Sequence, residues 1–297
     1  MFVRADQLLI EQTQDKFPLH ILDFHWDGFE PHMECRDLRD GEISEFDLED
    51  VRFAVSKKKT CIGQFDDDGE HVPCPKSTPV SRFNQCQNCS KESFIPHQEC
   101  IFNPECDGKR CLYGGGEIEF CQREHMLYLA FYNTDTKIGM SSSRRVEKRL
   151  VEQGADAFSI IGSFSSREEA RKWETKISSE MEIPQSHRQE SLLRSLVMPV
   201  DTDGIGSKLQ ELNHKLGAAY GMTPENLQLL DKYPIDLPLS QAPKLQESWG
   251  KHSGAFIGIK GRWLIYDSDG LKALNLSDLP ARFVSRQGAV SIGQREK

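Results

Sequence analysis

Hydrophobic and polar residues change their period several times along this chain, and the clearest pattern lies in its middle. Two apolar runs flank a polar turn, as in a β-hairpin, and two later stretches place apolar residues at helical spacing around a third apolar run. In chain order the pattern predicts strands over residues 126–131 and 137–140, a helix over 144–153, a strand over 157–161 and a helix over 166–181. These five closely spaced elements predict a compact α/β module.

Local signals set the limits of the two helices in this module. Ser166 and Glu169 have the spacing of a capping box, in which side chains satisfy the free backbone amides of the first turn. Gly154 follows the first helix, where glycine most easily adopts the left-handed conformation that ends a helix. The first helix is therefore expected to stop before Gly154, and the second to begin at Ser166.

Helices are also expected after the α/β module. Asp201 opens an amphipathic stretch for which Gly217 is the expected stop. Thr223 and Pro224 give a second start signal, since proline is favoured in the first helical turn. A Pro- and Gly-containing connector over residues 233–250 follows.

Both ends of the chain carry the short apolar runs that are typical of β-strands. Residues 19–22 and 51–55 form such runs near the N-terminus, and residues 256–266 have a strand–turn–strand pattern. Neither end is long enough to form a hydrophobic core alone, so the two are expected to meet in one β-rich unit. The fold class predicted for the whole chain is α+β.

The composition indicates a globular protein with a packed core. Hydrophobic residues make up 37% of 297 positions, more than an unfolded chain would carry. No run of about 18 apolar residues is present, which argues against a membrane span. The first residues lack the apolar stretch and cleavage site of a secretory signal, so a cytoplasmic location is expected.

Charge is distributed unevenly around a formal net charge of −9. Residues 1–60 hold 8 basic and 14 acidic side chains, whereas residues 122–177 hold 10 basic and 8 acidic ones. A nucleic acid would therefore meet the α/β module more readily than the acidic N-terminal segment, which suits a protein partner better. The sequence indicates neither a membrane partner nor a particular oligomeric state.

Nine cysteines are present, and eight of them fall in one stretch that has few periodic apolar positions. In a reducing cytoplasm such clustering favours metal ligation over disulfide bonds. Cys86 and Cys89 form a CxxC pair, whose short loop lets two thiolates bind one tetrahedral ion. The predicted ligands of one or two structural zinc ions are Cys61, Cys74, Cys86, Cys89, Cys100, Cys106, Cys111 and Cys121.

Alternatives to zinc stay open for these cysteines. An iron–sulfur cluster would use the same thiolates, and ordinary buried cysteines would bind nothing. A redox CxxC needs a helix-opening position in a βαβ unit, which this segment lacks. His125 could replace one cysteine as a ligand, whereas Cys35 stands apart from the cluster. A four-thiolate zinc site has no open position for a substrate, so a structural role is predicted.

Four residues of the α/β module follow one another in a recognisable order: Tyr128, Lys137, Arg149 and Glu174. The strand motifs Tyr128-Leu129-Ala130 and Lys137-Ile138-Gly139, with an arginine and a glutamate on the two following helices, resemble the GIY-YIG nuclease module. The resemblance implies that Tyr128, or a water it orients, attacks the phosphodiester, and that Arg149 stabilises phosphate charge. It also implies that Glu174 binds one divalent ion, Mg²⁺ or Mn²⁺. Tyr128, Lys137, Arg149 and Glu174 are the predicted catalytic residues.

Two positions depart from the GIY-YIG pattern. Lys137 replaces the tyrosine of the second motif, and Gln153 stands four residues after Arg149, where many active members carry histidine or tyrosine. The departures favour an alternative in which the module binds nucleic acid or a protein partner without cleaving it.

Ordinary structural roles are a further interpretation of these residues. Tyr128 would be a core tyrosine, Arg149 part of a solvated helix face, and Glu174 an ion-pair partner of Arg171. If the motif matches were incidental, Arg149 and Glu174 would not converge on Tyr128.

A wider set of motifs spans nearly the whole chain in a fixed order. The motifs are Val72-Pro73-Cys74-Pro75, Gln85-Cys86-Gln87-Asn88-Cys89, Asn103-Pro104-Glu105-Cys106, Arg123-Glu124-His125-Met126-Leu127-Tyr128-Leu129-Ala130, Gln153-Gly154-Ala155 and Gly258-Ile259-Lys260-Gly261-Arg262-Trp263-Leu264-Ile265. They resemble an uncharacterised Cys-rich bacterial and archaeal domain-of-unknown-function family. This resemblance implies an architecture and no particular activity.

Five segments are predicted from these observations. They are an N-terminal β-rich segment over 1–60, a Cys-rich zinc-binding segment over 61–124, a GIY-YIG-like α/β module over 125–200, a helical connector over 201–250 and a C-terminal β segment over 251–297. The expected function is metal-dependent cleavage of DNA or RNA, with structural zinc. The alternative is a non-catalytic, zinc-stabilised module that binds nucleic acid or protein.

Overall fold

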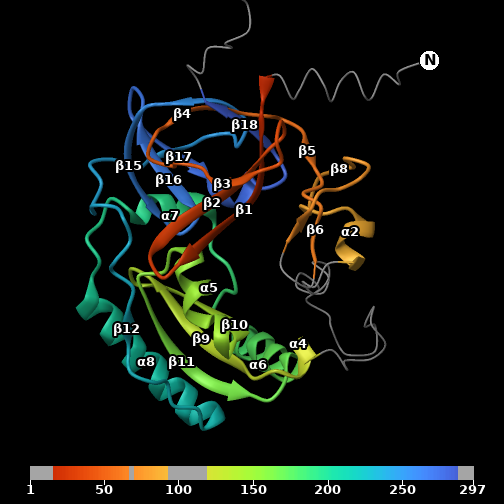
Figure 1. Ribbon diagram of the computed structural model, residues 1–297. Coiled ribbons are helices and arrows are strands. Elements are labelled where there is room, and N and C mark those ends of the chain that lie inside the picture. Colours follow the sequence, from red (N-terminus) through yellow and green to blue (C-terminus); the bar gives the residue numbers. More distant parts are fainter. Residues whose placement is uncertain (1–15, 67–69, 93–118, 287–297) are drawn as a thin grey trace, which may run out of the picture.

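The structure, a computed structural model, describes residues 16–66, 70–92 and 119–286, and these form an α+β fold (Figure 1). A six-stranded sheet lies at the top of Figure 1, the α/β module at the bottom, and the Cys-rich segment beside the six-stranded sheet. Among the described helices, none is long and apolar enough to cross a membrane.

Strands from both ends of the chain build the six-stranded sheet, in the order β14-β4-β18-β1-β2-β3. The strands are β1 (Leu19–Asp27), β2 (Glu30–Asp37), β3 (Ile43–Glu45), β4 (Arg52–Val55), β14 (Gly250–Ser253) and β18 (Phe283–Arg286). β18 pairs with both β1 and β4, so the C-terminal strand completes the N-terminal sheet. The expectation that the two ends meet in one β-rich unit is confirmed.

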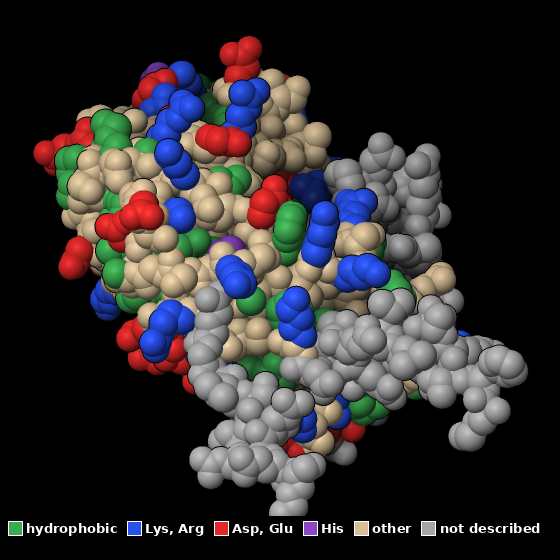
Figure 2. All heavy atoms as spheres, turned by 90° about the horizontal axis from the view of Figure 1, so that it is seen from above, with side chains coloured by type: hydrophobic (Ala, Val, Ile, Leu, Met, Phe, Trp, Pro, Cys, Tyr) green, Lys and Arg blue, Asp and Glu red, His purple; other side chains and the backbone are tan. Residues whose placement is uncertain are grey.

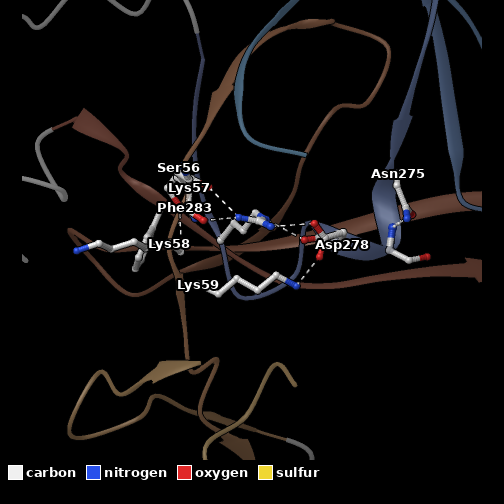
Figure 3. Close-up of polar contacts among 9 residues, drawn as sticks. Ser56, Lys57, Lys58, Lys59, Asn275, Asp278 and Phe283 are labelled. Carbon is white, nitrogen blue, oxygen red and sulfur yellow. Dashed lines mark hydrogen bonds and ion pairs between the residues drawn. The ribbon is translucent and has the colours of Figure 1, made fainter. Parts of the chain in front are cut away.

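A polar cluster fastens these two ends to each other (Figure 3). Asp278, in the 3-10 turn η2 (Leu276–Asp278), pairs with Lys59 Nζ at 2.9 Å and with Arg282 Nη2 at 2.8 Å. Arg282 Nη1 also donates to the backbone oxygen of Lys57 at 2.6 Å. Because Lys59 and Arg282 are buried, the Asp278 carboxylate is what balances their charge.

The described residues of the Cys-rich segment, 59–66, 70–92 and 119–124, form short elements. They are β5 (Lys59–Thr60), β6 (Gln64–Phe65), β7 (His71–Val72), β8 (Pro79–Val80), α2 (Gln87–Glu92) and α4 (Glu119–Gln122). The apolar cluster beside it consists of buried Leu22, Ile62 and Ala281, with Val80 packed against them. So small a core cannot by itself stabilise a loop-rich segment.

The α/β module contains the five elements that the hydrophobic pattern predicts, with each strand longer and each helix one or two residues shorter at its ends than predicted. They are β9 (His125–Tyr132), β10 (Asp135–Ser142), the 3-10 turn η1 (Ser143–Arg145) leading into α5 (Val146–Gln153), β11 (Ala157–Phe164) and α6 (Arg167–Glu180). Ser166 caps α6 by accepting a hydrogen bond from the Glu169 amide at 3.2 Å, and Gly154 ends α5 with φ +75°. The predicted helix limits are confirmed.

Three further elements surround this module: α7 (Gln189–Ser195), α8 (Thr202–Tyr220) and β12 (Gln228–Leu229). The predicted stop at Gly217 is wrong, because α8 continues to Gly221, which adopts φ +67° and donates its amide to the Gly217 carbonyl. The helix predicted to start at Thr223 and Pro224 is also wrong. The Glu225 amide donates to the Ile160 carbonyl at 2.7 Å, and β12 then pairs with β11, so the chain is drawn along the sheet edge.

The sheet of the module has the order β10-β9-β11-β12, and its two faces are covered differently. Leu127, Leu129 and Phe131 of β9 pack into one cluster with residues of α6 and α8. The alternate residues Tyr128 and Tyr132 point to the opposite face, towards α5. β9 is therefore buried on both sides.

A second four-stranded sheet lies between the module and the terminal β-strands. Its strands, in the order β13-β17-β16-β15, are β13 (Lys244–Leu245), β15 (Ala255–Lys260), β16 (Trp263–Asp267) and β17 (Leu271–Asn275). The predicted strand–turn–strand pattern over 256–266 is confirmed as the β15–β16 hairpin. One hydrophobic cluster includes Phe53, Tyr128 and Ile259. A single core therefore joins the six-stranded sheet and both four-stranded sheets.

Candidate functional site

Tyr128 and Lys137 lie on neighbouring strands and on the same face of the module. In the antiparallel register of β9 and β10, Lys137 is opposite Ala130, and Gly139 is opposite Tyr128. A Cβ atom on Gly139 would lie 2.6 Å from the Tyr128 hydroxyl. The tyrosine ring therefore occupies the space that any larger residue at position 139 would fill.

The first helix of the module brings Arg149 and Gln153 to the same place. Both side chains form hydrogen bonds with Tyr128, which is 1% exposed. The Tyr132 hydroxyl donates to Gln153 Oε1 at 3.5 Å. Arg149 itself is exposed, so it provides a solvent-accessible guanidinium beside a buried hydroxyl.

Glu174 comes from α6, which contacts both β9 and β10. Its carboxylate is buried and forms an ion pair with Arg171 through Oε2. The charge of Glu174 acts on both Tyr128 and Lys137. The structure therefore places Arg149 beside Tyr128 and brings Glu174 within electrostatic reach of Tyr128 and Lys137, although α6 packs on the sheet face opposite to the one that carries Tyr128.

The burial of these groups changes their pKa values. Burial raises the pKa of Tyr128, the Arg149 charge opposes this rise, and the Glu174 charge adds to it. Burial lowers the pKa of Lys137 to about 8, and repulsion by Arg149 and Arg262 contributes. Burial raises the pKa of Glu174, and Arg171 opposes this. Lys137 is thus close to its titration point near neutral pH.

Positive charge is in excess at this site. The carboxylates closest to it already pair with other cations, as Glu174 with Arg171, Glu152 with Arg145, and Asp156 with Lys260. Within the part of the chain that the structure describes, Lys137, Arg149 and Arg262 have no carboxylate at ion-pair distance. Their mutual repulsion costs free energy that a bound anion would recover.

Sequence reasoning missed three residues at this site: Arg262, Tyr132 and His187. The charges of Arg149 and Glu152 act on Arg262, and the His187 ring packs edge-on against Tyr132 with a centroid distance of 5.0 Å. Arg262 lies within a motif of the wider set, and Tyr132 lies just after another. No local pattern, however, predicts that Arg262 is close to α5, which is more than 100 residues earlier in the chain. His187 has no sequence signal at all.

A second cluster consists of four cysteines in the Cys-rich segment. The sulfur atoms of Cys61, Cys74, Cys86 and Cys89 all lie within 4.8 Å of one another. Four thiolates around a tetrahedral ion at metal–sulfur distances of about 2.3 Å are separated by similar amounts. These four residues can therefore hold one metal ion.

Backbone amides form hydrogen bonds with sulfur atoms of this cluster. The Cys61 sulfur accepts hydrogen bonds from the amides of Cys86 at 3.1 Å and Gly63 at 3.4 Å. Gly63 has φ +93°, and a Cβ atom there would lie 2.2 Å from the Val72 carbonyl oxygen. Burial raises the pKa of the Cys61 thiol to about 11 despite these amides, whereas at Cys74 amide and side-chain hydrogen bonds outweigh burial and bring the pKa to about 6. Amide donors of this kind favour the thiolate form that binds metals.

Among the remaining predicted ligands, the structure describes Cys121 and His125, and neither joins this cluster. Cys100, Cys106 and Cys111 lie outside the described residues, and Cys121 is half-buried on α4, apart from the four. His125 begins β9, where its Nδ1 lies 2.7 Å from the Arg123 carbonyl oxygen. The second zinc site stays a prediction. Cys35 is a core residue of β2, and burial raises its pKa to about 12.

The fold and these clusters define an α+β protein with a cluster of four cysteines that could hold a metal ion and a cation-rich site on its α/β module. The model of the family described as "Protein of unknown function (DUF2797)" matches residues 49–281, which include both clusters, and the chain belongs to this family. None of the curated proteins and none of the solved structures is significantly similar to it.

Proposed function

We propose that this protein is a cytoplasmic, metal-dependent nuclease-like enzyme that cleaves DNA or RNA at the site around Tyr128. The observation that carries the proposal is the convergence of a buried hydroxyl, a lysine, an exposed arginine and a buried carboxylate from four different elements. Their order and their positions on strands and helices resemble the GIY-YIG module. Phosphodiester cleavage needs this combination of nucleophile, cation and metal-binding carboxylate.

Arg149 and Glu174 have separate roles in the proposed reaction. Arg149 stabilises the charge that develops on the phosphate, since its guanidinium is exposed and has no competing carboxylate in the described chain. Glu174, whose Oε2 pairs with Arg171, would hold Mg²⁺ or Mn²⁺, and the ion would supply Lewis acidity at the phosphate.

Tyr128 and Lys137 are assigned the roles of nucleophile and proton donor in the proposed reaction. The Tyr128 hydroxyl, or a water that it orients, attacks the phosphorus and gives its proton to bulk water, and a phosphotyrosine formed by direct attack is then hydrolysed by a second water. The adjacent Arg149 charge opposes the rise that burial causes in the pKa of Tyr128. Lys137 acts as an ammonium that binds the phosphate and donates a proton to the leaving oxygen. This assigns proton transfer to the position at which GIY-YIG nucleases carry a tyrosine.

The four-cysteine cluster is proposed to bind zinc in a structural role. Its ligands are all thiolates, so a tetrahedral ion there would have no open position for a substrate. The small apolar core of the segment leaves metal binding as the main source of its stability. An iron–sulfur cluster, the alternative, would show visible absorption that zinc lacks.

Cleavage of a panel of oligonucleotides tests the proposal. Single- and double-stranded DNA and RNA are incubated with the protein, and Mg²⁺ or Mn²⁺ is added or withheld. Products that appear only with the metal are expected for at least one substrate. No product from any substrate with either metal would contradict the nuclease proposal.

The pH dependence of cleavage is expected to follow Lys137. Because the pKa of this amine is lowered to about 8, the ammonium form is lost above that pH. The value of kcat/KM, which reports the free enzyme, is therefore expected to fall about tenfold per unit above this pKa. Lys137→Arg, which keeps its charge, should remove this fall, and Lys137→Met should be slow at every pH. The same basic limb in Lys137→Arg would refute the role of Lys137.

A binding module without catalysis is the second candidate. It is favoured by Lys137 in place of the motif tyrosine and by the ion pair that already occupies Glu174. Such a module would bind nucleic acid with an affinity that falls steeply with salt, and it would release no product. Binding that is absent even at low salt would instead favour a protein partner.

A further inference from the structure

The tip of the β15–β16 hairpin reaches the α/β module. Gly261 and Arg262 form a two-residue turn between Lys260 and Trp263, which pair with each other across the hairpin. Gly261 adopts φ +58°, as expected of glycine in the first position of a type II′ turn. Arg262 is the second residue of this turn.

The hairpin tip lies directly on the C-terminal end of α5. A Cβ atom on Gly261 would lie 2.5 Å from the Gly154 nitrogen, so the two backbones are in contact. Trp26 Nε1 donates to the Gly261 carbonyl at 2.9 Å, and the Leu276 amide donates to the Arg262 carbonyl at 2.8 Å. These contacts fix the backbone on both sides of the turn.

A buried ion pair adds to this attachment. Lys260 Nζ pairs with Asp156 Oδ1, and both side chains are 6% exposed. The second oxygen of Asp156 accepts a hydrogen bond from the Asn133 amide at 2.6 Å. The residue next to Arg262 is therefore tied to the loop that follows α5, and the position of Arg262 relative to the module is set.

The Arg262 side chain shares the surroundings of the site residues. Burial lowers its pKa, and among nearby charges Arg149 lowers it further while Glu152 opposes this. The charge of Arg262 in turn acts on Lys137 and on Tyr132. Glu152 is already paired with Arg145 at 3.2 Å, so it does not neutralise Arg262.

A largely buried arginine beside two other cations is costly without an anion. Its guanidinium forms no hydrogen bond or ion pair with another side chain in the described residues, although its backbone is held tightly. Arginine is the side chain best suited to bind a phosphate through two parallel hydrogen bonds. A bound anion would therefore pair with the Arg262 guanidinium and offset this cost.

We propose that Arg262 is a substrate-binding residue of this site, whose guanidinium binds a phosphate of the polynucleotide strand that lies over Tyr128 and Arg149. The inference rests on the proposed function in that the same site receives a polynucleotide. It makes the site composite, because the C-terminal hairpin supplies one cation and the α/β module supplies the others.

Binding of labelled oligonucleotides without added Mg²⁺ or Mn²⁺ tests this inference. Fluorescence anisotropy is measured for single- and double-stranded DNA and RNA over a range of salt concentrations. Arg262→Gln is expected to weaken binding about five- to tenfold at low salt. It should also reduce the slope of log affinity against log salt by about 0.7 to 0.9, one phosphate contact. Arg262→Lys should recover part of the affinity.

A matched control removes a charge elsewhere in the terminal strands. Lys251 is exposed on β14, and Lys251→Gln should bind like the wild type. Equal binding by Arg262→Gln and the wild type would overturn the inference, as would no oligonucleotide binding by the wild type at low salt. It would also be overturned if folded Arg262→Lys lost as much affinity as Arg262→Gln, since the role would then be structural.

The outcome is separable from that of the nuclease proposal. Binding that depends on Arg262 in a protein that cleaves no substrate would support the inference and contradict catalysis. Metal-dependent cleavage that is unchanged in Arg262→Gln, with unchanged affinity, would support catalysis and contradict the inference.

Discussion

Replacing Arg149 by alanine is expected to slow phosphodiester cleavage about 10²- to 10³-fold, the usual cost of removing one charge-stabilising donor. The guanidinium is exposed and lies beside the buried Tyr128 hydroxyl, so its loss removes transition-state charge stabilisation without opening the core. Glu174→Gln is expected to slow cleavage to a similar extent and to abolish the response to Mg²⁺ or Mn²⁺. Single-turnover rates at saturating metal measure both effects.

The control variant replaces another arginine of the basic stretch over residues 144–149. Arg144 is exposed on η1, and Arg144→Ala removes the same charge without removing a neighbour of Tyr128. It is expected to keep most of the activity and, like Arg149→Ala, to melt close to the wild type, whereas Glu174→Gln breaks the ion pair with Arg171 and should melt at a lower temperature. Cleavage that survives in both Arg149→Ala and Glu174→Gln would exclude this site as the catalytic centre.

Replacing Cys86 by serine is expected to remove zinc from the four-cysteine cluster and to unfold the segment around it. Structural zinc contributes about 10–16 kcal/mol of apparent binding free energy in small metal-stabilised domains. The apolar cluster beside this segment has only three buried residues and cannot replace that contribution. Metal analysis should give about one zinc per chain from this cluster in the wild type and none in the variant.

Hydrogen exchange locates the effect of Cys86→Ser. Amides between β5 and α2 should lose their protection, while those of β9 and α5 keep it, because the latter belong to larger cores. Cys35→Ala is the matched control, since Cys35 is buried in the six-stranded sheet and should not affect zinc content. Less than about half an equivalent of zinc in the wild type, with no iron, would contradict metal binding.

The parts of the fold that could be predicted are those with strong local signals. The strands and helices from β9 to α6 follow from apolar periodicity, and the Ser166 cap and Gly154 stop follow from local backbone chemistry. The wrong predictions concern positions at which tertiary contacts override such signals. Pro224 signals a helix start, yet the following residues pair with β11 instead.

The candidate site also has residues that local signals in the sequence predict and residues that depend on tertiary contacts. Motif order along a compact module predicts that Tyr128, Lys137, Arg149 and Glu174 belong to one site, and their catalytic roles stay a prediction. Arg262 could not be predicted, because its place depends on the contact between Gly154 and Gly261, which joins two distant parts of the chain. Among the cysteines, spacing identified candidate ligands, but only the folded backbone shows that four of them share one centre.

Figure 2, a view from above the six-stranded sheet, shows both basic and acidic side chains on that face, which is at the other end of the molecule from the α/β module. The charge excess around Tyr128 follows from the pairing of nearby carboxylates with other cations, as Glu174 with Arg171 and Asp156 with Lys260. Net charge is therefore a poor guide to where this chain would bind a polyanion.

The most direct test of the account is the single-turnover cleavage rate of Tyr128→Phe. This change removes one hydroxyl from a buried ring that packs over Gly139, so the fold and melting temperature should change little. The account predicts that metal-dependent cleavage slows about 10²-fold or more, because the hydroxyl attacks the phosphorus or orients the attacking water. An unchanged rate in folded Tyr128→Phe would show that Tyr128 is an ordinary core residue and would contradict the proposed mechanism.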